Sequence, residues 1–153
     1  MSSRRDAIVM SDGELVAFLQ AERTAICATN GPRGWPHLMP LWYVVRDGTV
    51  WAWTFAKSQK VRNLQRDPHA TLQVEAGASY DQLRGVMIEA DTTIHSALET
   101  VSALGVELAA RYGGADPGAD AIAAVRAQAP KRVALEFAAA RTASFDHRKL
   151  ADG

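Results

Sequence analysis

Apolar residues recur at helical spacing in three stretches of the chain. The first, residues 11–23, opens with Ser11 and carries Glu14 three residues later, which is the pattern of a capping box. The second, residues 96–112, stops before a Gly-Gly pair, and the third, residues 118–129, is rich in alanine and ends at a proline. The pattern therefore predicts three amphipathic helices.

Apolar and polar residues alternate in most of the remaining sequence, which is typical of strands with one buried face. Asp47 and Gly48 lie between two apolar runs and predict a hairpin, because both central positions of its turn need a positive φ. Pro40, in the first of those runs, lacks an N–H group and so indicates a sheet edge, a bulge or the approach of a ligand. In the second run, one face carries Trp51, Trp53 and Phe55, and the other carries Val50, Ala52 and Thr54. Six strands are predicted, in residues 24–30, 37–45, 49–55, 70–76 and 132–145 and within the stretch 79–94, which begins as a loop.

A short helix is predicted in the stretch TFAKSQKVRNLQRDP, residues 54–68. Ser58 can cap it, Val61 and Leu64 would face inward, and the Asp-Pro pair ends it, because the residue before a proline avoids helical angles. The elements thus run helix, three strands, helix, two strands, two helices, strand. Without a regular strand–helix alternation, this order favours an α+β fold in which helices flank an antiparallel barrel.

The chain has 153 residues, enough for a single domain over residues 1–153 with one hydrophobic core. Its end, residues 146–153, is mostly polar, and we expect it to be loose. Seventeen basic residues balance 17 acidic ones, which argues against a broad affinity for nucleic acid or membranes. No apolar run approaches the ~20 residues that span a bilayer, and the N-terminus does not resemble a signal peptide. Because Cys27 is the one cysteine, no disulfide can form within the chain, and we expect a reducing, cytoplasmic location.

Positive charge concentrates in residues 54–68, although the chain as a whole is neutral. Lys57, Lys60, Arg62 and Arg66 fall within ten residues. A solvated helix face would explain them simply. An anion site is favoured because the two lysines lie at the start of the predicted helix, where cations oppose the helix dipole and free N–H groups attract anions. The aromatic strand before this corner could form the wall for a planar ring.

The stretch PLWYVVRDGTVWAWTFAKSQKVRNLQRDPHATLQV, residues 40–74, resembles the core of the split-barrel flavin-binding proteins, the superfamily that contains pyridoxamine 5'-phosphate oxidase. The resemblance starts at the N-terminal helix and continues through LRGVMIEAD, residues 83–91, to KRVALEFAAARTASFDHRKL, residues 131–150. It implies a six-stranded antiparallel split β-barrel with flanking helices. It also implies a homodimer whose interface groove holds the cofactor.

In that family, the strand that matches residues 39–43 lines the cofactor ring with its backbone. The corner that matches residues 53–60 holds the ring edge and the phosphate; here its two lysines and its serine would grip the phosphate, with Thr54 beside the ring or the ribityl chain. The strand start that matches Arg84 and Gly85 approaches the cofactor. The resemblance thus implies a set of cofactor-binding residues, namely Met39, Pro40, Leu41, Trp42, Trp53, Thr54, Phe55, Ala56, Lys57, Ser58, Lys60, Arg84 and Gly85.

The chain departs from the pyridoxamine phosphate oxidases at two places. The strand before the hairpin lacks their phosphate-binding arginine, and the ending FDHRKL, residues 145–150, is not their substrate motif. Together with KSQKVRNLQRDP, residues 57–68, that ending is more similar to the branch of FDOR-B type, which binds the deazaflavin coenzyme F420. This branch is typical of actinobacteria, and a composition rich in alanine and arginine is compatible with such an origin.

The resemblance therefore implies an oxidoreductase dependent on coenzyme F420, which would transfer a hydride to a conjugated organic acceptor such as an enone, a quinone or a tetrapyrrole like biliverdin. Two alternatives stay open: an FMN-dependent oxidase or reductase, and a split barrel that binds a flavin or haem without turnover. Tyr43, Tyr80 and His37 are candidate proton donors, but the sequence assigns no catalytic residue. The four histidines are scattered without ligand spacing, so we expect no metal site. The expected partners are a small-molecule substrate and a second copy of the chain.

Overall fold

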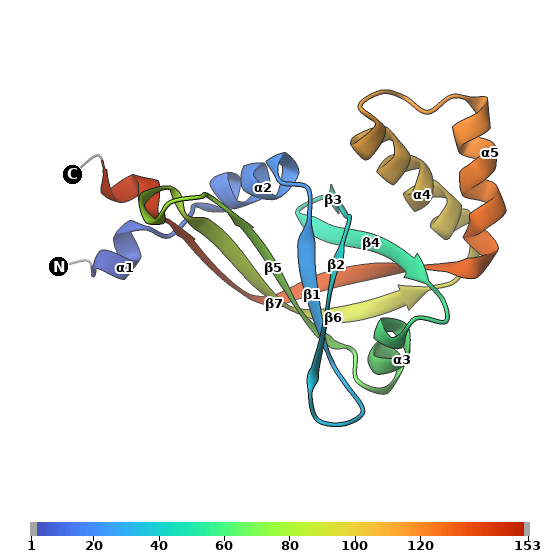
Figure 1. Cartoon of the computed structure of the whole chain (residues 1–153), viewed down its shortest axis with the longest axis horizontal. Helices are drawn as coiled ribbons and strands as arrows, with labels where there is room; N and C mark the ends of the chain where they lie inside the picture. The colour runs from blue at the N-terminus through green and yellow to red at the C-terminus, as the bar shows by residue number, and fades with distance from the viewer. Residues whose placement is uncertain (1–2, 152–153) are drawn as a thin grey trace.

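The computed structural model describes residues 3–151, which form one antiparallel sheet with helices around it (Figure 1). The strands lie in the order β2-β1-β5-β6-β7-β4-β3. They are β1 (Ala25–Asn30), β2 (Pro36–Leu41), β3 (Val44–Arg46), β4 (Thr49–Phe55), β5 (His69–Ala76), β6 (Arg84–His95) and β7 (Arg132–Asp146). The α-helices are α1 (Arg4–Ala7), α2 (Asp12–Ala21), α3 (Gln59–Arg66), α4 (Leu98–Gly113) and α5 (Ala119–Gln128). Short 3-10 helices are η1 (Tyr80–Gln82), η2 (Ala129–Lys131) and η3 (His147–Leu150).

The helices and turns form where the sequence predicts them. Ser11 accepts a hydrogen bond from the N–H of Glu14 at the start of α2, and Ser58 accepts one from the N–H of Val61 at the start of α3. The β3–β4 turn places Asp47 at φ 50° and its neighbouring glycine at φ 76°, as a tight hairpin requires. The predicted α+β class with an antiparallel sheet is confirmed.

Strand β6 pairs with β7 along its whole length, with a register shift between Glu89 and Ala90. A bulge of this kind bends a strand and increases its twist, and the sheet in Figure 1 is strongly curled. One end of these strands carries α1, α2 and both described chain ends, whereas α4 and α5 lie toward the other end. The two ends of β6 therefore lie in different environments, and the candidate site residues are divided between them.

Two apolar clusters hold the fold together. The larger one fills the inside of the curled sheet, and its largest fully buried side chains are Tyr43, Phe137, Leu19, Leu72 and Leu135. The smaller one joins α4 to the β3–β4 side of the sheet, with Val101, Leu104 and Ala134 fully buried. Helix α4 comes so close to the sheet that a Cβ on Gly105 would lie 2.6 Å from the Trp53 ring.

The number of strands differs from the six expected, because the run 37–45 divides into β2 and β3. The hydroxyl of Tyr112, at the end of α4, lies at the break: it accepts a hydrogen bond from the Tyr43 N–H at 3.0 Å, and its one proton is directed at the Arg23 carbonyl at 2.7 Å and the Tyr43 carbonyl at 3.1 Å. These bonds replace strand partners on both sides of one residue. The chain then leaves β1 and pairs with β4 instead.

The expectation of a loose C-terminal tail is wrong for residues 146–151. The carboxylate of Asp146 caps η3 and forms two hydrogen bonds with the Arg148 guanidinium, at 2.9 and 2.8 Å. Lys149 reaches the Glu14 carboxylate on α2 at 2.6 Å and the Val9 carbonyl at 2.9 Å. Charged side chains that look solvated in sequence therefore fasten this segment to the first helices. The remaining expectation, for residues 152–153, lies outside the described residues.

Among residues 3–151, no helix is both long enough and apolar enough to cross a membrane.

Candidate functional site

The basic corner lies where β4 passes into α3. β4 ends at Phe55, and a tight turn follows in which the N–H of Ser58 donates to the Phe55 carbonyl at 3.0 Å. The Ser58 hydroxyl then caps α3, and the helix packs against β1 and β6. Lys57 is exposed in the turn, whereas Lys60 points into the protein. The two lysines that the sequence groups together thus lie in different environments.

Lys60 is a buried cation without a counter-charge. The residue is only 7% exposed, and its Nζ donates to the Thr54 hydroxyl at 3.2 Å. No carboxylate of residues 3–151 lies within 4 Å of this ammonium. Desolvation by burial lowers the pKa of Lys60. A buried ammonium normally has an acidic partner, but no carboxylate of the described residues fills that role for Lys60.

The nearest ionisable neighbour of Lys60 cannot serve as that partner. Cys27 lies on β1 close enough for its charge to interact with the lysine, but burial raises the pKa of this thiol to about 11. The cysteine is therefore a neutral thiol at pH 7, as expected for a small buried residue. The corner thus offers a buried positive charge, a helix N-terminus and a capping hydroxyl, which together fit the phosphate of a flavin or a deazaflavin.

Polar side chains fix α3 in place behind this corner. The Asn63 amide is fully buried and donates to the Thr29 hydroxyl on β1 at 3.0 Å, while its oxygen accepts from Gln59 at 2.8 Å. Arg66 donates to the Asn30 carbonyl at the end of the same strand. These contacts hold the first turn of α3, and with it Lys60, at a defined position relative to the sheet.

The residues matched to the ring-lining strand lie on an edge of the sheet. Met39 and Pro40 are exposed on β2, and Leu41 is buried at its end. Pro40 thus occupies the edge position that its missing N–H predicts. Trp42 follows β2 and is 58% exposed, with one face stacked on Tyr112 at a centroid distance of 4.2 Å and an interplanar angle of 3°. Its exposed face could therefore contact a planar ring.

The end of β4 presents its aromatic residues in two ways. Trp53 packs against α4 at Gly105, so its indole faces away from the basic corner. Phe55 is 54% exposed, and the Arg132 guanidinium lies 3.6 Å from its ring centroid. Ala56 is half-buried in the turn and donates its N–H to the Lys131 carbonyl. Of the two aromatic residues, Phe55 is thus the one available at the surface.

Arg84 and Gly85 occupy the other end of β6, and their side-chain positions face opposite sides of the sheet, as the period of two requires. Gly85 lines a mostly apolar cavity of about 420 Å³ together with Leu38, Met87 and Phe145. A Cβ on Gly85 would lie 2.6 Å from the Phe145 ring, so this ring covers the glycine. The Arg84 side chain lines a different cavity, of about 720 Å³, between α2 and the C-terminal segment.

The predicted site residues therefore do not form one cluster within a single chain. Thr54, Ser58 and Lys60 gather at the corner where α3 begins, and α3 packs against β6, where the Thr92 N–H donates to the Pro68 carbonyl just after the helix. Gly85 precedes Thr92 by seven residues, or about 23 Å of strand at ~3.3 Å per residue. The corner and the start of β6 thus lie at opposite ends of the same strand.

The three candidate proton donors also lie apart from one another. The Tyr43 hydroxyl is buried and donates to the Leu19 carbonyl at 2.6 Å, and burial raises the pKa of this phenol well above its usual range. Tyr80 is 75% exposed in η1, where its ring contacts His147. His37 lies on β2, and its Nδ1 is buried without a hydrogen-bond partner among the described residues. Tyr43 is thus committed to the C-terminus of α2, and neither of the others contacts the corner.

Sequence reasoning missed the cavity at the C-terminal segment altogether. Its charged lining comes from Asp146, Arg148 and Lys149, which were expected to be loose. One signal was available in the sequence: an Asp followed two residues later by Arg can cap a turn and form an ion pair locally. The contribution of α2 to the same cavity depends on long-range packing and left no local signal.

Comparisons with known proteins agree with this fold. A sequence profile of the family described as "Pyridoxamine 5'-phosphate oxidase" matches residues 11–145. The crystal structure of the conserved hypothetical protein Rv2991 from Mycobacterium tuberculosis is 42% identical, with a TM-score of 0.91 over 98% of this chain and 93% of that one. No curated protein matches the chain in sequence.

More distant solved structures share the fold alone. A structure described as "F420 Reductase" is 20% identical, with a TM-score of 0.62 over 82% of this chain and 93% of that one. The heme storage protein HutZ from Vibrio cholerae is 14% identical, with a TM-score of 0.68 over 88% of this chain and 95% of that one. Proteins described as a reductase and as a heme storage protein thus share this fold.

Proposed function

The chain belongs to the pyridoxamine 5'-phosphate oxidase family, and we propose that it is an oxidoreductase that uses coenzyme F420 to reduce a conjugated organic acceptor. The acceptor class would be an enone, a quinone or a tetrapyrrole. The similarity in fold to a protein described as an F420 reductase is compatible with this cofactor. We also propose a cytoplasmic location, where Cys27 would stay reduced.

One observation carries the proposal: the ammonium of Lys60 is buried beside the neutral Thr54 hydroxyl, at the start of α3. Taking an ammonium out of water costs several kcal/mol unless a negative charge compensates it. A phosphate at this corner would supply that charge and would also accept from the free N–H groups of the helix. Ser58 and the exposed Lys57 would add further contacts to the same group.

A homodimer would bring the separated residues to one cofactor. Thr92, beside the end of α3, lies about 23 Å along β6 from Gly85, so the corner and the start of β6 are far apart within one chain. A second copy could place its own β6 start and its edge strand against the corner of the first. In this arrangement Met39, Pro40 and Trp42 would wall the ring, and Leu41 would support them from the core.

The residues of this chain would bind and orient rather than react. When bound, the deazaflavin would supply the hydride, and the protein would position its ring. Lys60 and Ser58 would fix the phosphate end, Thr54 would lie beside the ring or the ribityl chain, and the exposed Phe55 would shield the adjacent groove from water. The Trp53 and Arg84 backbones stay predictions from the family resemblance, since their side chains point elsewhere.

The test is a fluorescence titration of the purified protein with coenzyme F420 and, in parallel, with FMN, followed by turnover assays with reduced F420 and acceptors of the three classes. Tight F420 binding with acceptor reduction is expected. Tighter binding of FMN would replace the cofactor in the proposal, and cofactor binding without turnover would make the protein a carrier. Light scattering tests the dimer: a monomer that binds cofactor with full affinity would contradict the two-copy groove.

A further inference from the structure

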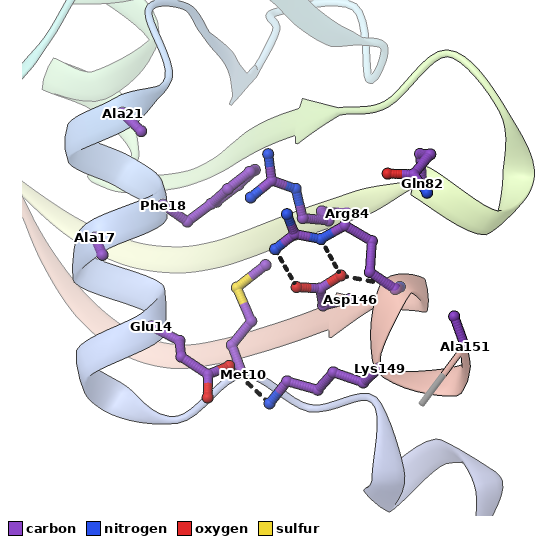
Figure 2. Close-up of a pocket in the computed structure, with 11 residues that line it drawn as sticks. Met10, Glu14, Ala17, Phe18, Ala21, Gln82, Arg84, Asp146, Lys149 and Ala151 are labelled. Atoms are coloured by element: carbon purple, nitrogen blue, oxygen red, sulfur yellow. Dashed lines mark hydrogen bonds and ion pairs between the residues drawn. The ribbon is translucent and has the colours of Figure 1, made fainter. Parts of the chain in front are cut away.

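We infer that the cavity between α2 and the C-terminal segment binds a small monocarboxylate with an apolar or aromatic body, and that Arg84 is its anion receptor. The inference goes beyond the proposed function and concerns a different part of the molecule. Figure 2 shows α2 on one side of this cavity, with Asp146 and Lys149 across from it. The two walls have different chemistry, and this difference defines the ligand.

The wall formed by α2 is apolar apart from Glu14. It carries Ala17, Phe18 and Ala21, and Met10 adds its side chain from the segment before the helix. The cavity measures about 720 Å³, which falls in the range of pockets that take small organic ligands. An apolar body of one or two fused rings would bury its surface against this wall.

The charges on the opposite wall are paired, with one exception. Asp146 holds Arg148 through two hydrogen bonds, and Lys149 pairs with Glu14 at 2.6 Å. These ion pairs fasten η3 and have little capacity left for a ligand. The exception is Arg84.

The Arg84 guanidinium is held in place without being satisfied. It lies 5.0 Å from the Phe18 ring centroid, a cation–π distance, and its strand position is fixed by pairing with β5 and β7. Its closest carboxylate is Glu22, whose oxygen is 3.8 Å away and so beyond hydrogen-bond distance. Nowhere in residues 3–151 does its side chain donate a hydrogen bond. A half-buried guanidinium with free donors at the wall of a cavity is a ready receptor for an oxyanion.

A carboxylate matches this receptor better than a phosphate. The planar guanidinium binds a carboxylate through two parallel hydrogen bonds. The lining carries three cations, Arg84, Arg148 and Lys149, against two carboxylates, and Glu22 outside it is the one further carboxylate within 4 Å of Arg84 among the described residues. A monoanion adds the least charge to this set, whereas a phosphate dianion would also meet the nearby carboxylates of Glu14 and Asp146.

The cavity is separate from the basic corner. Arg84 precedes Thr92, which lies beside the C-terminal end of α3, by eight residues, or about 26 Å of strand. Its side chain also faces the opposite side of β6 from the Gly85 position. A ligand on Arg84 should therefore bind independently of the cofactor.

The experiment measures binding of 2-naphthoate to the full chain by calorimetry, with 2-naphthamide as the neutral probe of the same shape. We expect one site per chain and at least tenfold weaker binding of the amide. R84Q should weaken naphthoate binding at least tenfold, while the matched control R33Q, at an exposed turn, should leave it unchanged. E22Q should tighten binding several-fold, because it removes the carboxylate that competes for Arg84.

Several results would overturn the inference. Equal binding of acid and amide, or equal loss in R84Q and R33Q, would show that Arg84 does not recognise the charge. Tighter binding of 2-naphthyl phosphate would contradict a carboxylate site. Displacement of naphthoate by FMN or coenzyme F420 would place Arg84 in the cofactor site. If R84Q fails to fold, E22Q and the amide still decide the question, and unchanged affinity in E22Q would count against the inference.

Discussion

Replacing Lys60 by Met tests whether the basic corner binds an anion. Methionine keeps the length and apolar stem of the lysine and removes the charge together with the bond to Thr54. The variant should bind coenzyme F420, or FMN if that is the cofactor, more weakly than the wild type. The neighbouring Lys57→Met variant serves as the matched control, because it removes an exposed lysine from the same turn.

The structure sets the size of the effect. A hydrogen bond to a charged partner contributes about 1.5–3 kcal/mol, which corresponds to roughly 10- to 150-fold in Kd at about 1.4 kcal/mol per tenfold. Lys60 is 7% exposed, so solvent and salt screen this contact little. An exposed pair contributes about 0–1 kcal/mol, so Lys57→Met should cost at most roughly fivefold. The difference between the two variants should persist at high salt.

The same substitution has an opposite effect on the protein without cofactor. Burial lowers the pKa of Lys60 below the ordinary value of 10.5, so the folded state binds fewer protons than the unfolded state between these two values. Stability therefore rises with pH in that interval, and the charged lysine opposes folding below it. Cofactor-free K60M should be at least as stable as the wild type at pH 7 and should lose this rise.

Two measurements decide the outcome: fluorescence titration of both variants with each cofactor, and urea unfolding of the cofactor-free proteins at pH 7 and pH 10. Weaker binding with undiminished stability is the expected result for K60M. A Kd within twofold of the wild type would refute the anion-binding corner. Lower stability of K60M at pH 7 would show that the buried ammonium supports the fold by itself.

Three further predictions concern the fold that positions the site. Tyr112→Phe removes the hydroxyl that replaces strand pairing between β2 and β3, and should lower the free energy of unfolding by about 1–3 kcal/mol in urea titrations. Gly105→Ala places a Cβ 2.6 Å from the Trp53 ring and should cost about 1–3 kcal/mol by the same assay, whereas an alanine at an open helix position should not. The side-chain hydrogen bond from Arg148 lowers the pKa of Asp146 below its ordinary value of 3.8. The carboxylate therefore stabilises the fold above pH 3.8, and this stabilisation is lost as the pH falls through the lowered pKa. Asp146→Asn should flatten the acid limb of a curve of stability against pH.

The regular elements could be predicted because their signals are local. The caps at Ser11 and Ser58 and the turn at Asp47 are encoded within four residues, and all three form as expected. The division of the 37–45 run could not be predicted in this way, since the group that lies at the break is a tyrosine hydroxyl about 70 residues further along the chain. The order of the tail has the same origin, because Lys149 finds its partner, Glu14, at the opposite end of the sequence.

The residue types at the corner could also be predicted, but not their orientation. Spacing places Lys57 and Lys60 at a helix start, but Lys57 precedes the cap Ser58 and lies in the turn, whereas Lys60 lies in the first turn of α3. One lysine therefore faces solvent and the other faces the core. Only the packing of α3 on β1, fixed by the buried Asn63, decides which of them is buried. The buried one carries the stronger functional argument, although sequence treats the two as equivalent.

Arg84 and Gly85 show where alternation should have limited the family resemblance. A motif assigns neighbouring positions to one ligand, yet neighbours on a strand point to opposite faces, and a ligand on one face can contact the other residue only through its backbone. The sequence predicts this strand, so the separation of the two side chains was predictable from its period. The sequence could not show which residues surround the Arg84 side chain on its face of the strand, because Phe18 and Asp146 reach Arg84 from opposite ends of the chain. A family motif on a strand therefore assigns a side chain to a ligand only after the face of that side chain is known, and at Arg84 this rule separates the proposed carboxylate site from the cofactor groove.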